Sequence, residues 1–232
     1  MNSTKKAARV AGALYLLNAV TGFFGIMYVP STLIVSGNAA ATANNVLSSE
    51  MLFRVGIVSE LICATASIFL VRALYRLLNG VNKRHASLMV TLVLVSVPIM
   101  FLNVLNEIAA LALFRGADFL SVFEKQRLDA LAMLFLGLHD QGFVVAEIFW
   151  GLWLFPFGVL VMRSGFLPRI LGVLLIAACF GYLVQSLTSL LLPSYGDLVS
   201  RFVSIPAAVG ELSIVAWLLI KGAKDQPLDA PA

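Results

Sequence analysis

The sequence predicts an all-α, polytopic membrane protein, a bundle of six transmembrane helices with both termini in the cytoplasm. Three observations lead to this fold class: the composition, the number of long apolar runs and the distribution of basic residues. Of the 232 residues, 60% are hydrophobic and 12% are charged, whereas soluble domains average about 45–50% apolar and about 25% charged residues. A spanning helix uses roughly 20 residues, so six of them leave only short loops. We therefore expect a single membrane domain over residues 1–232 and no soluble catalytic module.

Six apolar runs are long enough to cross about 30 Å of hydrocarbon. The predicted spans cover residues 8–28, 51–78, 86–114, 131–162, 170–192 and 202–220. Pro30 and Pro193 are expected to end the first and fifth spans, because proline lacks the backbone N–H that an interior helical residue donates. Residues 36–49 are expected to form a polar loop, residues 115–129 to form interfacial amphipathic turns, and residues 221–232 to form a polar cytoplasmic tail.

Basic residues are distributed unequally between the two sides of these spans. Eleven of the 16 Lys and Arg residues fall on the side that carries both termini. Cytoplasmic loops are enriched in Lys and Arg, so this side is predicted to be cytoplasmic. The same rule accounts for the net charge of +4 without a nucleic-acid partner. The lipid bilayer is the expected partner, and the oligomeric state stays open.

Polar side chains inside the spans are the clearest indication of function. Five acidic residues lie within spans, and each costs at least about 2.5–3.5 kcal/mol near the centre of a membrane helix. They are Glu60, Glu107, Asp140, Glu147 and Glu211. Such residues normally face a bundle interior or a water-filled cavity. The candidate ligand-binding residues are Asn18, Arg54, Glu60, Glu107, His139, Asp140, Gln185 and Glu211.

Position along the predicted helices places most of these groups at one depth. At about 1.5 Å per residue, the acidic residues other than Glu147, together with His139 and Gln185, lie roughly 10–14 Å below the outer surface. Five carboxylates cannot all stay ionised in a low dielectric with few cations nearby. Arg54 and Arg201 at the outer rim, and His139 within the layer, are the candidate counter-ions. The remaining carboxylates are expected to be protonated, hydrated or bound to a cation.

Established catalytic motifs are missing from the sequence. It contains no GxSxG, no HExxH and no glycine-rich phosphate loop. Only two histidines occur, His85 in a predicted cytoplasmic turn and His139 in a span, which excludes a multi-histidine zinc or haem site. A carboxylate-rich site with one histidine suits a hard or borderline cation. The two cysteines, Cys63 and Cys179, lie in apolar runs and form no CxxC motif, so we expect them to be packing residues.

Four stretches of the sequence resemble one family. They are KKAARVAGALYLLNAVTG, AAATANNVLSSEMLFRVGIVSEL, SGFLPRILGVLLI and PAAVGELSIVAWLLIKG. Together they are similar to the bacterial integral membrane proteins catalogued as "domain of unknown function 4386", and the resemblance covers nearly the whole chain. It implies a location in the cytoplasmic membrane of a bacterium. It also implies that four polar residues fall at polar positions of the family pattern: Arg54, Glu60, His139 and Glu211. Family members usually carry Asp at the position of Glu60.

The leading hypothesis is a non-enzymatic membrane protein whose acidic and histidine-containing pocket, in the outer half of the bundle, binds or passes a small ligand, a proton or a cation. Two alternatives stay open. A membrane-embedded enzyme acting on a lipophilic substrate would need a carboxylate within hydrogen-bond reach of His139. A structural or accessory subunit would use the polar groups only as contacts between helices. The sequence identifies neither a cofactor nor a metal.

Overall fold

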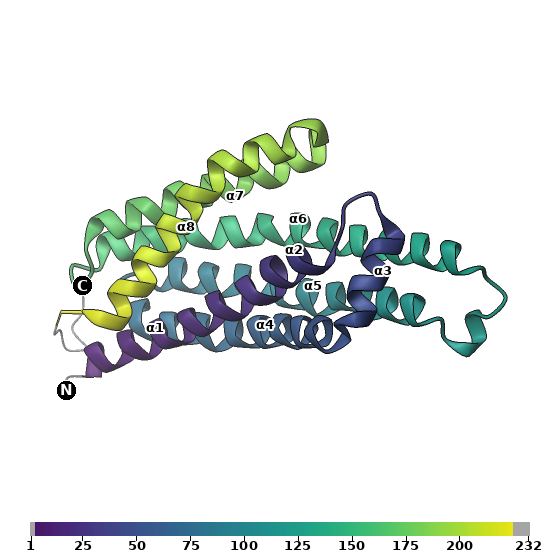
Figure 1. The fold of residues 1–232 in the computed structure, drawn as a ribbon. Helices are drawn as coiled ribbons and strands as arrows, with labels where there is room; N and C mark the ends of the chain where they lie inside the picture. The colour runs from purple at the N-terminus through teal and green to yellow at the C-terminus, as the bar shows by residue number, and fades with distance from the viewer. Residues whose placement is uncertain (1–2, 225–232) are drawn as a thin grey trace. The chain divides into compact units, whose positions relative to one another are not determined.

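Long helices account for most of the structure. The computed structural model describes residues 3–224, and no strand occurs among them. The helices in chain order are α1 (Ser3–Gly22), a π-helical segment (Phe23–Tyr28), α2 (Val29–Leu33), α3 (Ala39–Ser48), α4 (Glu50–Leu78), α5 (Lys83–Arg115), α6 (Lys125–Arg163), α7 (Arg169–Leu191) and α8 (Gly196–Ile220) (Figure 1). Short 3₁₀ turns lie at Asp118–Leu120 and Pro193–Tyr195. Residues 225–232 of the predicted tail lie outside the described residues.

Six helical stretches are long and apolar enough to cross a membrane, which confirms the predicted fold class. They are Thr4–Leu33, Glu50–Leu78, Lys83–Arg115, Lys125–Arg163, Arg169–Leu191 and Leu198–Ile220. The first combines α1, the π-helical segment and α2. The helices alone do not orient the chain across a bilayer, so the cytoplasmic position of the termini stays a prediction.

The segment after the first span differs from its prediction. Pro30 does not end the helix, which continues to Leu33. The proline occupies the first turn of α2, directly after the π-helical segment, where its missing N–H and fixed φ are tolerated. The polar stretch 36–49 also contains more than a loop, because α3 forms within it. Alanine favours helix, and the side chain of Asn38 caps α3 by accepting a hydrogen bond of 2.9 Å from the Ala41 N–H.

The fourth span differs as well. Interfacial turns were expected before a separate span, but residues 125–163 form one continuous helix of 39 residues. At about 1.5 Å per residue this helix is about 58 Å long, so it must extend beyond the hydrocarbon layer. Its first residues, 125–127, are exposed, and Lys125 pairs with Asp129 while Arg127 pairs with Glu124, just before the helix. Ion pairs spaced three or four residues apart stabilise such an exposed helical extension.

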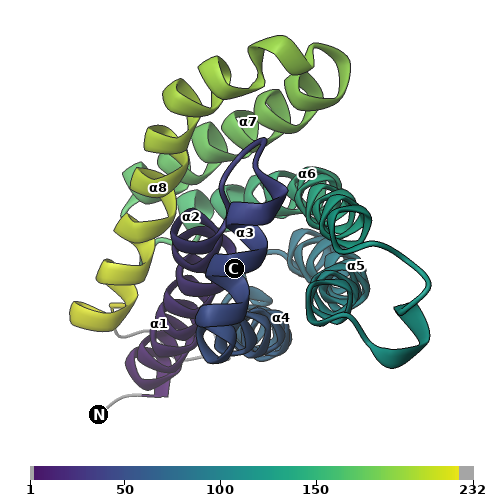
Figure 2. The same cartoon turned by 45° about the vertical axis from the view of Figure 1, so that its right-hand side comes forward.

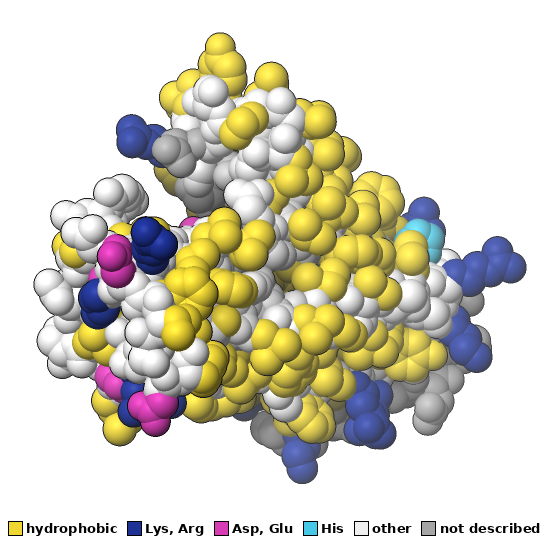
Figure 3. Space-filling model, turned by 90° about the vertical axis from the view of Figure 1, so that its right-hand side faces the viewer, with side chains coloured by type: hydrophobic (Ala, Val, Ile, Leu, Met, Phe, Trp, Pro, Cys, Tyr) yellow, Lys and Arg dark blue, Asp and Glu magenta, His cyan; other side chains and the backbone are white. Residues whose placement is uncertain are grey.

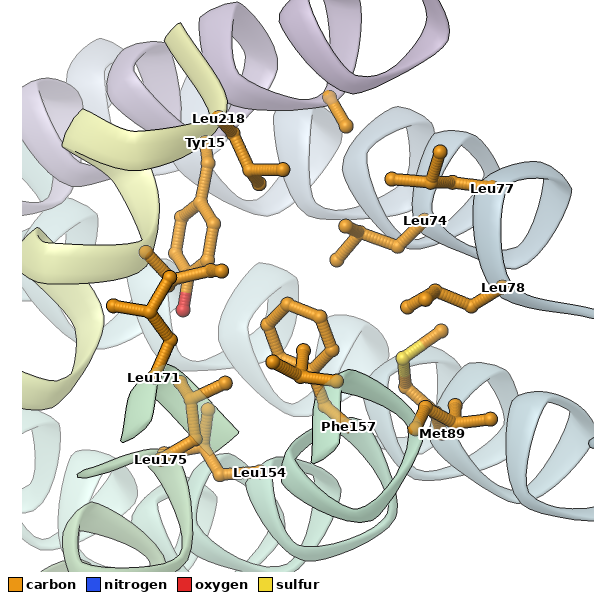
Figure 4. Packing of buried hydrophobic residues seen from close by; sticks show 14 of the residues in the cluster. Tyr15, Leu74, Leu77, Leu78, Met89, Leu154, Phe157, Leu171, Leu175 and Leu218 are labelled. Carbon is orange, nitrogen blue, oxygen red and sulfur yellow. The ribbon is translucent and has the colours of Figure 1, made fainter. Parts of the chain in front are cut away.

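The chain forms two compact units. The first comprises, of the described residues, 3–17, 66–97 and 144–224. Within it α7 and α8 lie side by side as a hairpin (Figures 1 and 2). Its core is made of large apolar side chains, and Figure 4 shows Tyr15, Phe157 and Leu218 among them. Trp153 stacks on Phe157 with ring centroids 5.3 Å apart. Close packing of this kind holds membrane helices together, because lipid offers no hydrophobic driving force.

The second unit comprises residues 18–65 and 98–143. Its buried apolar core contains Phe53 of α4, Val104 and Phe114 of α5, and Leu136 of α6. Polar side chains are also buried in this unit, among them Asn103, Glu107 and His139. The second unit therefore combines an apolar core with the buried polar groups expected of a site.

Apolar side chains cover much of the surface. On the face drawn in Figure 3, hydrophobic side chains form a broad area and charged side chains lie toward its edges. Among the large apolar residues exposed in the described part are Val20, Phe69, Leu102 and Phe180. A soluble monomer rarely exposes continuous apolar surface of this kind. The distribution is that of helices whose outer faces contact lipid.

Candidate functional site: a buried carboxylate–imidazole cluster

Three residues from three helices of the second unit come together in its interior. Glu60 of α4, Glu107 of α5 and His139 of α6 are exposed by only 2%, 2% and 3%. We call them the carboxylate–imidazole cluster. The Nε2 atom of His139 lies 3.1 Å from Oε2 of Glu60 and 3.7 Å from Oε2 of Glu107. One nitrogen and two carboxylate oxygens therefore converge on one point, with all three atoms within 4.8 Å of one another.

Parts of the cluster lack a hydrogen-bond partner. Oε1 of Glu60 and Oε2 of Glu107 are buried and accept no hydrogen bond from any described residue. The ion pairs that Glu60 and Glu107 make within residues 3–224 all involve His139. Two carboxylates thus face a single imidazole without a lysine or arginine partner. Buried polar groups are normally satisfied, and an unpaired buried charge is costly, so the cluster favours the uptake of a proton or of another cation.

The helix that carries His139 is held close to α5 by Asn103. The Asn103 side-chain amide donates a hydrogen bond of 2.9 Å to the backbone carbonyl of His139. Gly142 permits this approach, because a Cβ at that position would overlap the Asn103 side chain. The His139 ring also meets the ring of Phe143 edge-on, with centroids 4.6 Å apart. These contacts fix the position of the imidazole opposite the two carboxylates.

The Glu60 side chain is confined from the side of the first span. A Cβ on Gly25, in the π-helical segment, would lie 2.6 Å from Cγ of Glu60 and 2.9 Å from the Gly56 carbonyl oxygen. Only glycine therefore allows this segment to pass so near α4. Segments of π-helix inside longer helices occur frequently at functional sites. Gly25, Gly142 and Phe143 were not among the predicted site residues, although a mid-span glycine beside polar residues is a usable signal of close approach.

Glu211 has a different environment, in the first unit. Tyr15 Oη donates a hydrogen bond of 2.5 Å to Oε2 of Glu211, and Tyr182 Oη donates one of 2.6 Å to Oε1. Both carboxylate oxygens are thus satisfied by phenol groups of α1 and α7. The two tyrosines were not predicted, because their pattern in the sequence is that of ordinary packing aromatics. Glu211 is therefore hydrogen-bonded to two tyrosines. Among the described residues it belongs to no group of three that could hold a metal ion.

The remaining predicted site residues lie outside the carboxylate–imidazole cluster. Arg54 is exposed and pairs with Glu50 at 2.7 Å, one helical turn away, and its partner is therefore not Glu60. Asn18 donates a hydrogen bond of 2.9 Å to the Cys63 carbonyl oxygen. Asp140 is exposed. Gln185, in the first unit, donates to Ser189 at 3.3 Å. Asn18 thus joins the first span to α4, whereas the others make local or surface contacts.

Comparison with known proteins places the chain in a family. A family model described as "Domain of unknown function (DUF4386)" matches residues 10–222. The chain belongs to this family. The matched region includes Glu60, Glu107 and His139 and nearly all of the six spans.

The description of a similar protein names no activity. This DUF4386 chain is 34% identical, over 90 residues, to a protein of Archaeoglobus fulgidus described as an "Uncharacterized protein". The aligned region is 39% of this chain and 49% of the relative, so the chain spans about half the length of the curated relative it matches. No solved structure matches the chain. Any function must therefore be argued from the geometry of its own residues.

Proposed function

We propose that this DUF4386 protein resides in the cytoplasmic membrane of a bacterium and binds a small cation through Glu60, Glu107 and His139. The observation that supports this most is the unpartnered, buried Oε2 of Glu107, 3.7 Å from Nε2 of His139. A cation at the point where the three side chains converge would satisfy this oxygen and balance the excess negative charge. Ionisable residues inside membrane segments commonly mark ion pathways and ligand sites.

Burial supports binding of an ion rather than of a large ligand. The three side chains are almost fully buried, and their ligand atoms lie within 4.8 Å of one another. Donor atoms this close together can surround one ion, whereas drug-sized molecules need pockets of typically about 300–1,000 Å³. Depth in the outer half of the membrane, as the predicted orientation has it, would connect this site to the external side of the bilayer.

The test is cation-dependent thermal stability of the purified protein in detergent. A ligand that binds only the folded state raises the melting temperature, by an amount that grows with the logarithm of the ratio of its concentration to its Kd. After chelation, sodium, potassium, magnesium, calcium, manganese and zinc ions are added separately. At least one of them should raise the melting temperature of the wild type and leave Glu107→Gln unchanged. The matched control is Glu124→Gln, which removes an exposed carboxylate outside the cluster and should respond as the wild type does. No effect of any cation, or equal effects on Glu107→Gln, would overturn the proposal.

A membrane-embedded acid–base enzyme is the second candidate, and one distance favours it. His139 Nε2 lies 3.1 Å from Glu60 Oε2, within the hydrogen-bond reach that an acid–base pair requires. The two functions are separated by comparing membrane lipids from cells that express the wild type or His139→Gln. An enzyme acting on a lipid would leave a substrate accumulated and a product depleted in the variant. Identical lipid profiles would exclude this candidate and leave cation binding.

A further inference from the structure

The identity of the cation follows from the atoms that would hold it. Resting on the cation-binding function proposed above, we infer that the cluster is a site for a divalent transition metal of the zinc type. Its donors are one imidazole nitrogen and two carboxylate oxygens. Imidazole suits zinc, copper, iron and nickel, whereas magnesium and calcium take oxygen ligands. The histidine therefore selects against the hard alkaline-earth cations.

The separations between the donor atoms fit a tetrahedral metal. Ligands held about 2.0–2.1 Å from a tetrahedral zinc ion lie about 3.3–3.4 Å from one another. The two separations from His139 Nε2, 3.1 Å to Glu60 Oε2 and 3.7 Å to Glu107 Oε2, lie on either side of that value. The third separation, between the two carboxylate oxygens, lies within 4.8 Å, so rotation of these side chains would complete the tetrahedral arrangement.

The number of donors also argues for zinc over calcium. Calcium takes 6–8 oxygen ligands at about 2.3–2.6 Å, and the cluster has three residues to offer. Magnesium keeps several of its waters, which a site lined by side chains exposed by 2–3% does not readily accommodate. Zinc needs only four ligands, so three protein ligands leave a single position for a water, as in many zinc sites.

A second observation, independent of the spacing, points to an absent ligand. Glu107 is exposed by only 2%, and its Oε2 accepts no hydrogen bond from the described residues while lying 3.7 Å from the imidazole nitrogen. A carboxylate that served only to join helices would be expected to have found a donor, as Glu211 has in Tyr15 and Tyr182. Oε2 of Glu147 is buried and unpartnered too, but among the described residues only the carboxylates of the cluster combine this with a histidine nitrogen and a second carboxylate oxygen within 4.8 Å.

Cobalt(II) provides the test, because it replaces zinc in tetrahedral sites and its visible absorption reports the geometry. The metal-free wild type in detergent should bind one cobalt ion per chain, with the strong visible bands of a tetrahedral N/O site, and added zinc should bleach them. Glu107→Gln and His139→Gln should each bind cobalt at least about 100-fold more weakly, since loss even of an outer-shell partner costs about 10–100-fold. Controls are Glu124→Gln and His85→Gln, which alter the same residue types outside the cluster and should retain wild-type spectra.

The outcomes separate this inference from the function on which it rests. If sodium, potassium, magnesium or calcium stabilises the wild type and cobalt and zinc do not bind, the metal class is wrong while cation binding stands. If no cation binds the wild type, both are wrong. Wild-type cobalt spectra in both cluster variants would place the metal elsewhere and also overturn the inference. Thermal unfolding shows whether each variant is folded. If one variant is not folded, cobalt binding by the wild type still tests whether the protein has a site for this class of metal.

Discussion

His139 Nε2 lies 3.1 Å from Oε2 of Glu60, although the two residues are 79 positions apart in the chain. Helices α4 and α6 therefore bring a base and an acid together in the apolar interior of the second unit. Glu107 adds a second carboxylate from α5, with its Oε2 3.7 Å from the same nitrogen. The arrangement has more negative than positive groups, and the predictions below follow from that imbalance and from the contacts that maintain it.

Replacing Glu107 by glutamine should not destabilise the protein when cations are absent. The substitution keeps the shape of the side chain and removes a buried carboxylate that has no hydrogen-bond donor at Oε2. Because an unpaired buried charge is costly, neutralising such a group is expected to leave the free energy of unfolding unchanged or to raise it. Chemical or thermal unfolding in detergent with a chelator measures this. A loss of more than about 2 kcal/mol would show that Glu107 is a structural hydrogen-bonding residue.

Gly142→Ala should loosen the attachment of α6 to α5. A methyl group at position 142 would overlap the side chain of Asn103, which holds the His139 carbonyl. Overpacking of this kind costs about 1–3 kcal/mol, and the shift of His139 should also weaken cation binding. Gly137→Ala is the matched control on the same helix, because nothing lies within 4 Å of a Cβ there. Equal effects of the two substitutions on the melting temperature would contradict the close approach at Gly142.

Tyr15→Phe and Tyr182→Phe should each destabilise the first unit. Each substitution removes a hydroxyl that donates to Glu211 at 2.5 or 2.6 Å, and hydrogen bonds to a charged group are worth about 1.5–3 kcal/mol. A double-mutant cycle with Glu211→Gln isolates these contributions, because the tyrosine effect should shrink when the carboxylate is gone. Tyr195→Phe is the control, since Tyr195 is exposed. Additive effects of Tyr15→Phe and Glu211→Gln would argue against the network.

The side of the membrane on which the loops lie is testable by cysteine labelling. In a chain whose Cys63 and Cys179 are replaced by alanine, single cysteines are introduced at Asn82, between α4 and α5, and at Val122, between α5 and α6. Lys and Arg are in excess on the side of the membrane that carries the α4–α5 loop, which predicts that this loop is cytoplasmic. A membrane-impermeant maleimide added to intact cells should therefore label Val122→Cys and leave Asn82→Cys unlabelled. The reverse pattern would invert the topology.

Most of the fold could be predicted from the sequence because hydrocarbon imposes length and composition on each span. The exceptions are local. Helix α3 and the continuation of the first helix past Pro30 depend on the Asn38 cap and on tolerance of proline in a first helical turn, which hydropathy does not reveal. The long α6 depends on ion pairs near Lys125 that make its first turns stable in water.

The residues of the candidate site could be predicted only in part, because the sequence gives their depth along each helix but not the direction in which each side chain points. Glu60, Glu107 and His139 meet, as their common depth suggested. Depth along a helix, however, does not say which side chains at one level face one another. Glu211 therefore could not be assigned to its tyrosine partners from sequence, and neither could Arg54 to Glu50. Rotation of each helix about its own axis and the positions of glycines decide these contacts.

Anomalous X-ray diffraction at the zinc absorption edge, from crystals grown with zinc, would locate a metal ion bound at Glu60, Glu107 and His139. We expect one strong peak per chain, within about 2.0–2.2 Å of Nε2 of His139 and of one carboxylate oxygen from each of Glu60 and Glu107. A cluster without a peak, in which a protein donor satisfies Oε2 of Glu107, would contradict it.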